Sequence, residues 1–506
     1  MTGHFQVSRR QAILGAAASA FALATAARNG AFAALPDHTY ATMTARPAIR
    51  ALRAGRTTAR DYAEALMNRA EALASLNAFI SQDKVAVRDA ADAIDKRVAD
   101  GENVGPLYGL PFCLKDNINT TDMPTTGGTV ALKGWYPVAD APVTAQLREA
   151  NGVLIGKTNM HELAFGITSN NAAWGPVRNP YVQAAIPGGS SGGTAAAVAA
   201  GLAPVGLGSD TGGSCRIPAA LCGCVGFRPT LGRYSQSGIL PISSTRDTAG
   251  PLARTVDDVA LIDQICAVER PNITQVPLDG VRIGVPRAYF YENLDPQVTV
   301  LTNHALATLS NAGAALVEVD IPNLADLNNA VSFPIALYEV LREMSAYLYK
   351  AGNRLTVSEL VSQVAGNAEQ GILGSQMGPD AIPAVVYRQA ISEGRPKLIA
   401  VYESYFADNN LSALVVPTTP LPARPIGQED TVELNGEQVP TFFTYIRNTD
   451  PPSNAGVPCL SVPAGITGNQ LPVGIEFVGP TNSDARLLGI GRAYEKARGR
   501  LPPPRL

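Results

Sequence analysis

Histidine is scarce in this chain: its 506 residues contain only four, at positions 4, 38, 161 and 304. Serine hydrolases of the α/β-hydrolase class need a histidine that follows the nucleophile in the chain. The segment Gly188–Gly192 (GGSSG) matches the G-x-S-x-G motif of that class, but only His304 follows it, in the middle of a helical pattern. The shortage of histidine therefore argues against a Ser-His-Asp triad.

Cysteine, charge and long apolar runs are also in short supply. Six cysteines form no disulfide framework in a chain of this length, and Cys222 and Cys224 have C-x-C spacing with no histidine cluster nearby, which argues against a zinc site. The formal net charge is −3 and no block of basic residues occurs, so we expect no nucleic-acid partner. After the N-terminal region, no apolar run reaches the roughly 18 residues that span a bilayer.

The first 33 residues have the composition of an export signal. They contain no acidic residue, and Arg9 and Arg10 precede an alanine-rich apolar run that extends to Ala27. Ala31-Phe32-Ala33 then supplies a small-x-small cleavage site. We interpret residues 1–33 as a twin-arginine signal peptide, which predicts a periplasmic or secreted protein with no membrane association once the signal is removed.

Helical and strand patterns alternate along residues 34–506 without a low-complexity linker. They predict helices after Thr58 and over residues 85–98, 194–200, 296–312 and 483–498, and strands over residues 110–115, 153–156, 281–285, 316–319, 414–416 and 475–478. Residues 323–410 are predicted to be mainly helical. One large α/β domain with a helical insertion is the simplest interpretation.

The most unusual stretch is rich in glycine and runs from Ile186 to Thr230. Because glycine loses much backbone entropy on folding, a cluster of this kind indicates that the chain turns sharply or approaches a ligand closely. Two serines lie beside these glycines: Ser190 in GGSSGG and Ser214 in DTGGS. A hydroxyl placed there can act as a nucleophile, and the neighbouring backbone N–H groups can stabilise an oxyanion.

A serine nucleophile needs a base, and two lysines at the ends of apolar strands are candidates. Lys115 follows LPFCL, and Lys157 follows VLIG. Burial lowers the pKa of a lysine and can leave its amine neutral. The spacing does not choose between the two. The segment VLIGKT also resembles the end of a phosphate-binding loop, but asparagine occupies position 151, where the first glycine of that motif belongs.

Taken together, the motifs resemble the amidase signature family over most of residues 34–506. GGSSGG and the block G-[ST]-D-[TI]-G-G-S-x-R-x-P, the core pattern of that family, lie between Gly188 and Pro218. Related features occur over residues 109–116 (GLPFCLKD), 156–160 (GKTNM) and 223–230. The resemblance implies a central mixed, twisted β-sheet covered by helices on both faces, and an amidohydrolase activity that uses no metal or cofactor.

The resemblance also assigns roles to individual residues. Lys115 is the expected base, Ser190 the bridging serine, joined to Gly189 by a cis peptide bond, and Ser214 the nucleophile that forms an acyl-enzyme. The other positions carried over are the oxyanion-binding N–H groups of Thr211, Gly212, Gly213 and Ser214, the structural supports Asp210 and Arg216, and the substrate-binding residues Gly127, Gly128 and Ser191. We expect His161 to be a packed histidine rather than an acid or base.

The segment from Lys157 to Pro180 is most similar to the indoleacetamide and mandelamide hydrolase branch, which implies a small aryl or arylalkyl amide as the substrate. Aromatic residues of the helical insertion suit an apolar acyl group; they are Tyr338, Tyr347, Tyr349, Tyr402, Tyr405 and Phe406. Anilides, carbamates or esters remain alternative substrates, and a subunit of the amidotransferase A type or an inactive binding protein are alternative functions. The export signal argues against the amidotransferase. A homodimer is neither favoured nor excluded.

Overall fold

The computed structural model describes residues 36–269, 273 and 276–506. The predicted signal peptide therefore lies outside the described residues. Within the described part of the chain, no helix has both the length and the apolar composition needed to cross a membrane. All six cysteines are buried and none forms a disulfide, as their scattered positions predict.

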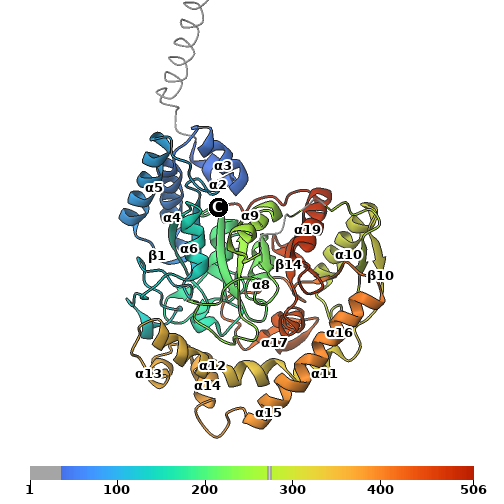
Figure 1. Ribbon diagram of the computed structural model, residues 1–506. Coiled ribbons are helices and arrows are strands. Elements are labelled where there is room, and N and C mark those ends of the chain that lie inside the picture. Colours follow the sequence, from blue (N-terminus) through green and yellow to red (C-terminus); the bar gives the residue numbers. More distant parts are fainter. Residues whose placement is uncertain (1–35, 270–272, 274–275) are drawn as a thin grey trace, which may run out of the picture.

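A mixed sheet of eleven strands forms the centre of the molecule (Figure 1), in the order β1-β3-β2-β6-β8-β7-β14-β15-β11-β9-β10. Strands β3, β2 and β6 run parallel, as do β11, β9 and β10, and the other neighbours are antiparallel. The strands of this sheet are β1 (Phe79–Ser81), β2 (Pro111–Lys115), β3 (Val153–Thr158), β6 (Val205–Asp210), β7 (Val225–Arg228), β8 (Thr248–Ala253), β9 (Arg282–Gly284), β10 (Ala315–Val317), β11 (Ala413–Pro417), β14 (Cys459–Ile466) and β15 (Pro472–Val478). Two separate hairpins are formed by β4 (Asn170–Asn171) with β5 (Gly175–Pro176) and by β12 (Thr431–Leu434) with β13 (Glu437–Pro440).

The α-helices of the described residues are α2 (Asp37–Thr42), α3 (Ala45–Arg53), α4 (Ala59–Ala72), α5 (Lys84–Ala99), α6 (Pro142–Glu149), α7 (Gly192–Ala199), α8 (Arg216–Cys222), α9 (Val256–Cys266), α10 (Pro296–Asn311), α11 (Leu324–Asn329), α12 (Ser332–Lys350), α13 (Val357–Ser362), α14 (Asn367–Ser375), α15 (Ala384–Gln389), α16 (Arg395–Asp408), α17 (Thr441–Ile446), α18 (Asp450–Ala455) and α19 (Asp484–Arg498). Short 3₁₀ turns include η3 (Glu162–Ala164).

Helices cover both faces of the sheet, as the family resemblance implies. On one face, α8 packs so closely that a Cβ atom at Gly226 of β7 or Gly474 of β15 would lie 2.7 Å from an alanine Cβ of α8. Only glycine fits at these two positions. On the other face, the ring of Phe477 in β15 meets that of Tyr494 in α19 edge to face, with centroids 5.6 Å apart.

The predicted elements are present, and the predicted β-α-β unit is β9-α10-β10 with its two strands parallel. Thr58 caps α4 by accepting a hydrogen bond from the Asp61 N–H at 2.9 Å. Strands β6, β7, β8 and β14 were not predicted as strands. They carry glycine, serine and proline in place of a β-branched run, and burial from both faces holds them in the sheet.

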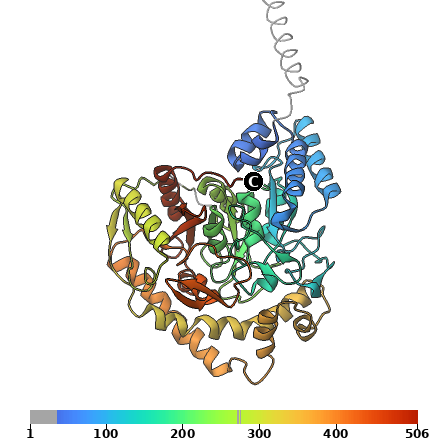
Figure 2. The ribbon, with the colours of Figure 1, turned by 180° about the vertical axis from the view of Figure 1, so that it is seen from behind.

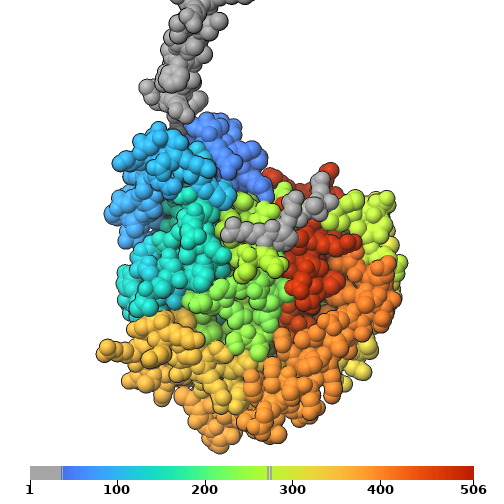
Figure 3. All heavy atoms as spheres, viewed as in Figure 1, coloured from blue at the N-terminus to red at the C-terminus, as the bar shows by residue number. Residues whose placement is uncertain are grey.

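Helices α11 to α16 form a band at the end of the molecule opposite the N-terminal helices (Figures 1 and 2). This band occupies the segment predicted to be a helical insertion, and the space-filling view shows it closing that end of the molecule (Figure 3). Residues of α12, α14 and α17 line a cavity together with residues that follow β6. The fold therefore places the insertion beside the glycine-rich loops.

Candidate active site

The candidate site lies where the parallel neighbours β2 and β6 end. β2 ends at Lys115 and β6 at Asp210, and Leu114 pairs with Leu207 between them. This register places Lys115 next to Ser209, the residue before the end of β6. The carboxyl ends of parallel strands open at one edge of a sheet, where α/β proteins bind their ligands.

Lys115 is fully buried and its amine faces hydroxyl groups. Its Nζ lies 2.7 Å from Ser190 Oγ and 2.8 Å from Ser209 Oγ, and Asn117 Nδ2 donates to Ser209 Oγ at 2.9 Å. Lys115 forms no ion pair with any residue in the described ranges. Burial lowers the pKa of Lys115 to about 8. A neutral amine is therefore accessible at mildly alkaline pH.

The second candidate lysine has a different environment. Lys157 Nζ lies 3.3 Å from Asp116 Oδ1, and both side chains are fully buried. The same amine donates to Thr125 Oγ1 at 2.8 Å and to the Pro124 carbonyl at 3.1 Å. Lys157 thus neutralises a buried carboxylate and fastens the loop after β2. The structure distinguishes Lys115 from Lys157, which the sequence spacing leaves as equal candidates for the base.

Ser190 belongs to the turn that precedes α7. The Gly189–Ser190 peptide bond is cis, as the family resemblance implies, and Ser190 is fully buried. Its carbonyl accepts a hydrogen bond from the His161 N–H at 3.1 Å, and its hydroxyl faces Lys115. Ser190 is therefore fixed from two sides, with its hydroxyl toward the buried amine.

Ser214 follows β6, just before α8, and is 8% exposed. Its carbonyl accepts a hydrogen bond from the Ser191 N–H at 3.2 Å, which ties the two glycine-rich loops together. Among the residues that the structure describes, none hydrogen-bonds the Ser214 hydroxyl or the N–H groups of Thr211, Gly212 and Ser214. These groups are free to meet a ligand.

Gly213 differs from the other predicted oxyanion donors. Its N–H donates to Asp210 Oδ1 at 3.0 Å, and the Cys215 N–H donates to Asp210 Oδ2 at 3.0 Å. The carboxylate thus already occupies the Gly213 N–H. The predicted oxyanion site is therefore reduced to the N–H groups of Thr211, Gly212 and Ser214.

Asp210 holds the loop after β6 through a fully buried charge network. Arg216 and Arg228 each place a guanidinium nitrogen 3.0 Å from Asp210 Oδ1, and Arg216 also binds Glu476 at 2.7 Å. Burial acts to raise the pKa of Asp210, but the two guanidinium groups outweigh it and hold this pKa well below its usual value. Asp210 therefore remains ionised and braces the loop on which Ser214 lies.

A cavity of about 450 Å³ opens over Ser214. Its lining is largely apolar, with aromatic rings on one wall. Phe333 lies 5.5 Å from Phe443 and 6.1 Å from Phe442, measured between ring centroids. The lining residues are Ala164, Phe165, Gly166, Ile167, Thr211, Gly212, Ser214, Ile242, Arg246, Ser332, Phe333, Ala336, Leu337, Ile372, Phe442, Phe443, Ile446 and Asp450. The nucleophile candidate thus faces a cavity suited to an apolar group.

Three residues expected to bind substrate do not line this cavity. A Cβ at Gly127 would contact Leu240, one at Gly128 would lie 2.8 Å from Asn171 Nδ2, and both glycines have φ in the left-handed region. They therefore serve the packing of the loop after β2. Ser191 donates from Oγ to the Ser209 carbonyl at 3.1 Å and joins the two loops.

The aromatic residues named from the insertion also lie outside the cavity lining. Tyr402, Tyr405 and Phe406 pack in a core cluster with Leu414, and Tyr349 is 85% exposed. Tyrosines that recur at helical spacing mark the face that packs on the core. The aromatic wall of the cavity consists of phenylalanines from several segments.

A family model described as Amidase matches residues 61–488. The chain belongs to the amidase signature family. It is similar to an indoleacetamide hydrolase of Allorhizobium ampelinum, with 43% identity over 448 residues that cover 88% of this chain and 96% of that protein. It is also similar to a mandelamide hydrolase of Pseudomonas putida, with 39% identity over 487 residues, 93% of this chain and 94% of the other.

Solved structures support the same assignment. A crystal structure of an amidase superposes with a TM-score of 0.82 at 34% identity and covers 90% of this chain and 100% of that one. The native peptide amidase of Stenotrophomonas maltophilia gives a TM-score of 0.80 at 31% identity, over 93% of this chain and 99% of the other. The protein is therefore an amidase, and amides are its substrates.

In this amidase, two side chains that follow β3 fasten α14 to the site. His161 Nδ1 accepts the Ser169 N–H at 3.2 Å, so its Nε2 carries the hydrogen that is donated to Glu369 Oε1 at 2.5 Å. Glu162 accepts the N–H groups of residues 365 and 366, just before α14. His161 is thus a packed, hydrogen-bonded histidine, and α14 carries Ile372 into the cavity wall.

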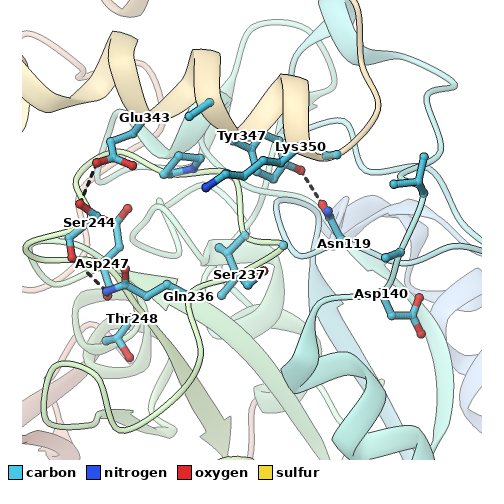
Figure 4. Close-up of a pocket in the computed structure, with 17 residues that line it drawn as sticks. Asn119, Asp140, Gln236, Ser237, Ser244, Asp247, Thr248, Glu343, Tyr347 and Lys350 are labelled. Carbon is cyan, nitrogen blue, oxygen red and sulfur yellow. Dashed lines mark hydrogen bonds between the residues drawn. The ribbon is translucent and has the colours of Figure 1, made fainter.

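The amidase has a second cavity, of about 280 Å³, beside the C-terminal half of α12 (Figure 4). Polar side chains line it, among them Asp247, Glu343 and Lys350, whereas Lys115 and the two serines do not. Asp247 connects the two cavities, since its Oδ1 accepts a hydrogen bond from Thr211 Oγ1 at 2.6 Å.

Within the described residues, no group of three histidine, cysteine or acidic side chains could hold a metal ion.

Two polar residues near Lys115 have no role in the sequence-based prediction: Ser209, whose hydroxyl contacts the Lys115 amine, and Asn117, which donates a hydrogen bond to that hydroxyl. Ser209 is the serine of the G-[ST]-D part of the family block, and Asn117 lies two residues after Lys115. Both were visible as polar residues at the ends of buried strands. Their contact depends on the pairing of β2 with β6, which spacing along the chain does not reveal.

The Lys115 environment predicts the pH dependence of the amidase. The base expected at Lys115 must be a neutral amine to accept a proton, and the pKa of Lys115 is lowered to about 8. We expect kcat/KM to rise about tenfold for each pH unit below that value and to level off above it. A pH–rate profile on a neutral amide measures this. A flat profile between about pH 6 and 9 would contradict a base of this pKa.

Proposed function

We propose that this amidase hydrolyses a small aryl or arylalkyl amide to the acid and ammonia through an acyl-enzyme on Ser214, with Lys115 as the base and Ser190 as the proton relay. The observation that carries this proposal is the 2.7 Å approach of Lys115 Nζ to Ser190 Oγ. A buried amine with a lowered pKa, next to a serine hydroxyl, is suited to accept its proton.

In the proposed acylation step, Ser214 Oγ attacks the amide carbonyl carbon. Its proton passes to Ser190 Oγ, and the Ser190 proton passes to neutral Lys115. The tetrahedral intermediate then collapses as Ser190 protonates the leaving nitrogen and recovers a proton from Lys115. Ammonia departs and the acyl group remains on Ser214. Water repeats the sequence in the second half-reaction, giving the acid and restoring the Ser214 hydroxyl.

The proposed oxyanion site is the set of N–H groups on the loop after β6. Those of Thr211, Gly212 and Ser214 have no partner among the residues described. Each such donor contributes roughly 3 kcal/mol to stabilising the transition state. The Thr211 carbonyl and hydroxyl are held by Arg246 and Asp247, so the loop is positioned before substrate arrives.

The lining of the cavity over Ser214 supports an aromatic acyl group. Phe333, Phe442 and Phe443 present rings on one wall, with Ile372 and Ala336 nearby on the lining. A volume of about 450 Å³ is within the range that proteins use for small organic ligands. The names of the indoleacetamide and mandelamide hydrolase relatives favour the same substrate class. Anilides, carbamates and esters on the same scaffold are the alternative.

Replacement of the nucleophile should abolish the reaction. We expect Ser214→Ala to lower ammonia release from indole-3-acetamide by at least about a thousandfold, because no acyl-enzyme can form. A fluorophosphonate should label Ser214 in the native protein, as located by peptide mass spectrometry, and should leave Ser214→Ala unlabelled.

The matched control is Ser362→Ala, which removes an exposed hydroxyl on α13 and should change neither result. Labelling without any amide hydrolysis would favour ester or carbamate substrates. If Ser214 resisted the reagent while the protein stayed folded, the acyl-enzyme proposal would fail and an inactive binding protein would be favoured.

A larger side chain in the cavity should slow the hydrolysis of amides with large acyl groups more than that of amides with small ones. Ala336 lies on the lining, so Ala336→Trp should lower kcat/KM for indole-3-acetamide at least tenfold and spare acetamide. The control is Ala346→Trp, the same change on the same helix but on the second cavity, which should spare both amides. Equal losses on the two substrates in Ala336→Trp would show that the acyl group does not occupy this cavity.

We also propose that the amidase is exported, on the strength of the twin-arginine pattern of residues 1–33. In a Gram-negative host, cell fractionation should find the chain in the periplasm with an N-terminus near Ala34. Arg9→Lys together with Arg10→Lys should retain an uncleaved precursor in the cytoplasm. A native chain that stays cytoplasmic and uncleaved would overturn the proposal.

A further inference from the structure

The cavity over Ser214 carries one ion pair on its otherwise apolar wall. Arg246 is 3% exposed and Asp450 is 5% exposed, and both line the cavity. Arg246 Nη2 donates to Asp450 Oδ1. Burial of a charged group is unfavourable unless its hydrogen-bonding groups have partners. Any donor or acceptor of this pair that lacks a partner in the protein therefore indicates which ligand group the cavity can bind.

The guanidinium of Arg246 uses four of its five N–H groups. Nε donates to the Thr211 carbonyl at 3.3 Å, and Nη1 donates to the carbonyl and hydroxyl of Ser332 at 3.1 and 3.2 Å. Nη2 donates one hydrogen to Asp450. Its second hydrogen has no partner in the described part of the chain, which leaves one donor.

Asp450 leaves an acceptor position beside that donor. Its Oδ2 accepts hydrogen bonds from Asn328 Nδ2 at 2.8 Å and from Asn454 Nδ2 at 3.2 Å. Its Oδ1 accepts only from Arg246 among the described residues. A carboxylate oxygen accepts two hydrogen bonds, so Oδ1 retains one lone pair.

The missing side chain of Gly212 opens this pair to the cavity. A Cβ at Gly212 would lie 2.8 Å from Ile446 Cδ1, 3.2 Å from Arg246 Nη2 and 3.4 Å from Asp450 Oδ1, so any larger side chain there would press on Ile446 and cover the ion pair. Glycine places no side chain between the ion pair and the cavity, and Gly212 itself lines the cavity two residues before Ser214. A small polar atom can therefore contact the donor and the acceptor together, close to the nucleophile.

We propose that Arg246 and Asp450 bind a hydroxyl group on the substrate carbon next to the scissile carbonyl. A hydroxyl accepts from Arg246 and donates to Asp450 at the same time. The ion pair carries no net charge, so it favours a neutral substituent over a carboxylate or an ammonium group. This assignment rests on the proposed function, since it places a 2-hydroxy-2-arylacetamide with its carbonyl at Ser214.

The test compares matched amides on the native enzyme. We expect kcat/KM for 2-hydroxy-2-phenylacetamide to exceed that for phenylacetamide by about tenfold. In contrast, 4-hydroxyphenylacetamide carries its hydroxyl at the far end of the ring and should gain nothing. Ammonia release is measured for all three.

Two variants test whether Arg246 and Asp450 recognise the 2-hydroxyl group or only support the cavity wall. Asp450→Asn keeps the shape of the side chain, and Arg246→Lys keeps the positive charge. Each should reduce the preference for the 2-hydroxy amide to less than about twofold. If Arg246 and Asp450 had a purely structural role, each variant would lower kcat/KM for both amides by the same factor and leave the ratio of the two values unchanged. Ile372→Val, an apolar change on the same cavity, is the control that should leave the ratio at the native value.

A native ratio near one, or a ratio unchanged in both variants, would overturn the assignment while the amidase still releases ammonia. Loss of the proposed function gives a different result, because an arylacetamide would then not be hydrolysed at all. Equal preference for the two hydroxylated amides would also contradict the proposed position of the binding site.

Discussion

The chemistry of the candidate active site depends on which groups surround each buried lysine amine. Removing an ammonium group from water is unfavourable, and a lysine responds either by pairing with a carboxylate or by giving up its proton. Lys157 pairs with Asp116, whereas Lys115 faces Ser190 and Ser209, and burial lowers its pKa to about 8. Two lysines on adjacent strands, equally buried, thus have different chemistry because their neighbours differ. The hydroxyl groups of Ser190 and Ser209 surround the Lys115 amine.

Rigid support for that arrangement comes from Asp210. Its two oxygens bind Arg216, Arg228 and the backbone of the loop on which Ser214 lies, all away from water. Loss of one member would leave a buried charge without its partner, which is strongly destabilising. The network therefore fixes the loop on which Ser214 lies, and the N–H groups of Thr211, Gly212 and Ser214 on that loop have no partner among the described residues.

The motifs predicted which side chains meet near the ends of β2 and β6, because glycine, serine and lysine at fixed spacing report local backbone requirements. The fold class followed from the alternation of periodic segments. The cavity did not follow, since its walls come from segments as distant as Phe165, Phe333 and Phe443, which meet only after the sheet is complete. The occupied N–H of Gly213 could not be predicted either, because it depends on the rotamer of Asp210. Strands such as β6 were missed because tertiary burial, rather than intrinsic propensity, holds glycine-rich segments extended.

The three proposed catalytic residues, Lys115, Ser190 and Ser214, all lie between residues 115 and 214, whereas half of the residues that line the cavity come after residue 330. This separation along the chain has an evolutionary consequence. Changes in α12, α14 or α17 can reshape the cavity over Ser214 without removing a residue that hydrogen-bonds the Lys115 amine. Changes confined to the second half of the gene can therefore alter this cavity while the three proposed catalytic residues stay in place. Recombination within such a family would exchange one half of the cavity lining, while the segment with the three proposed catalytic residues is inherited unchanged.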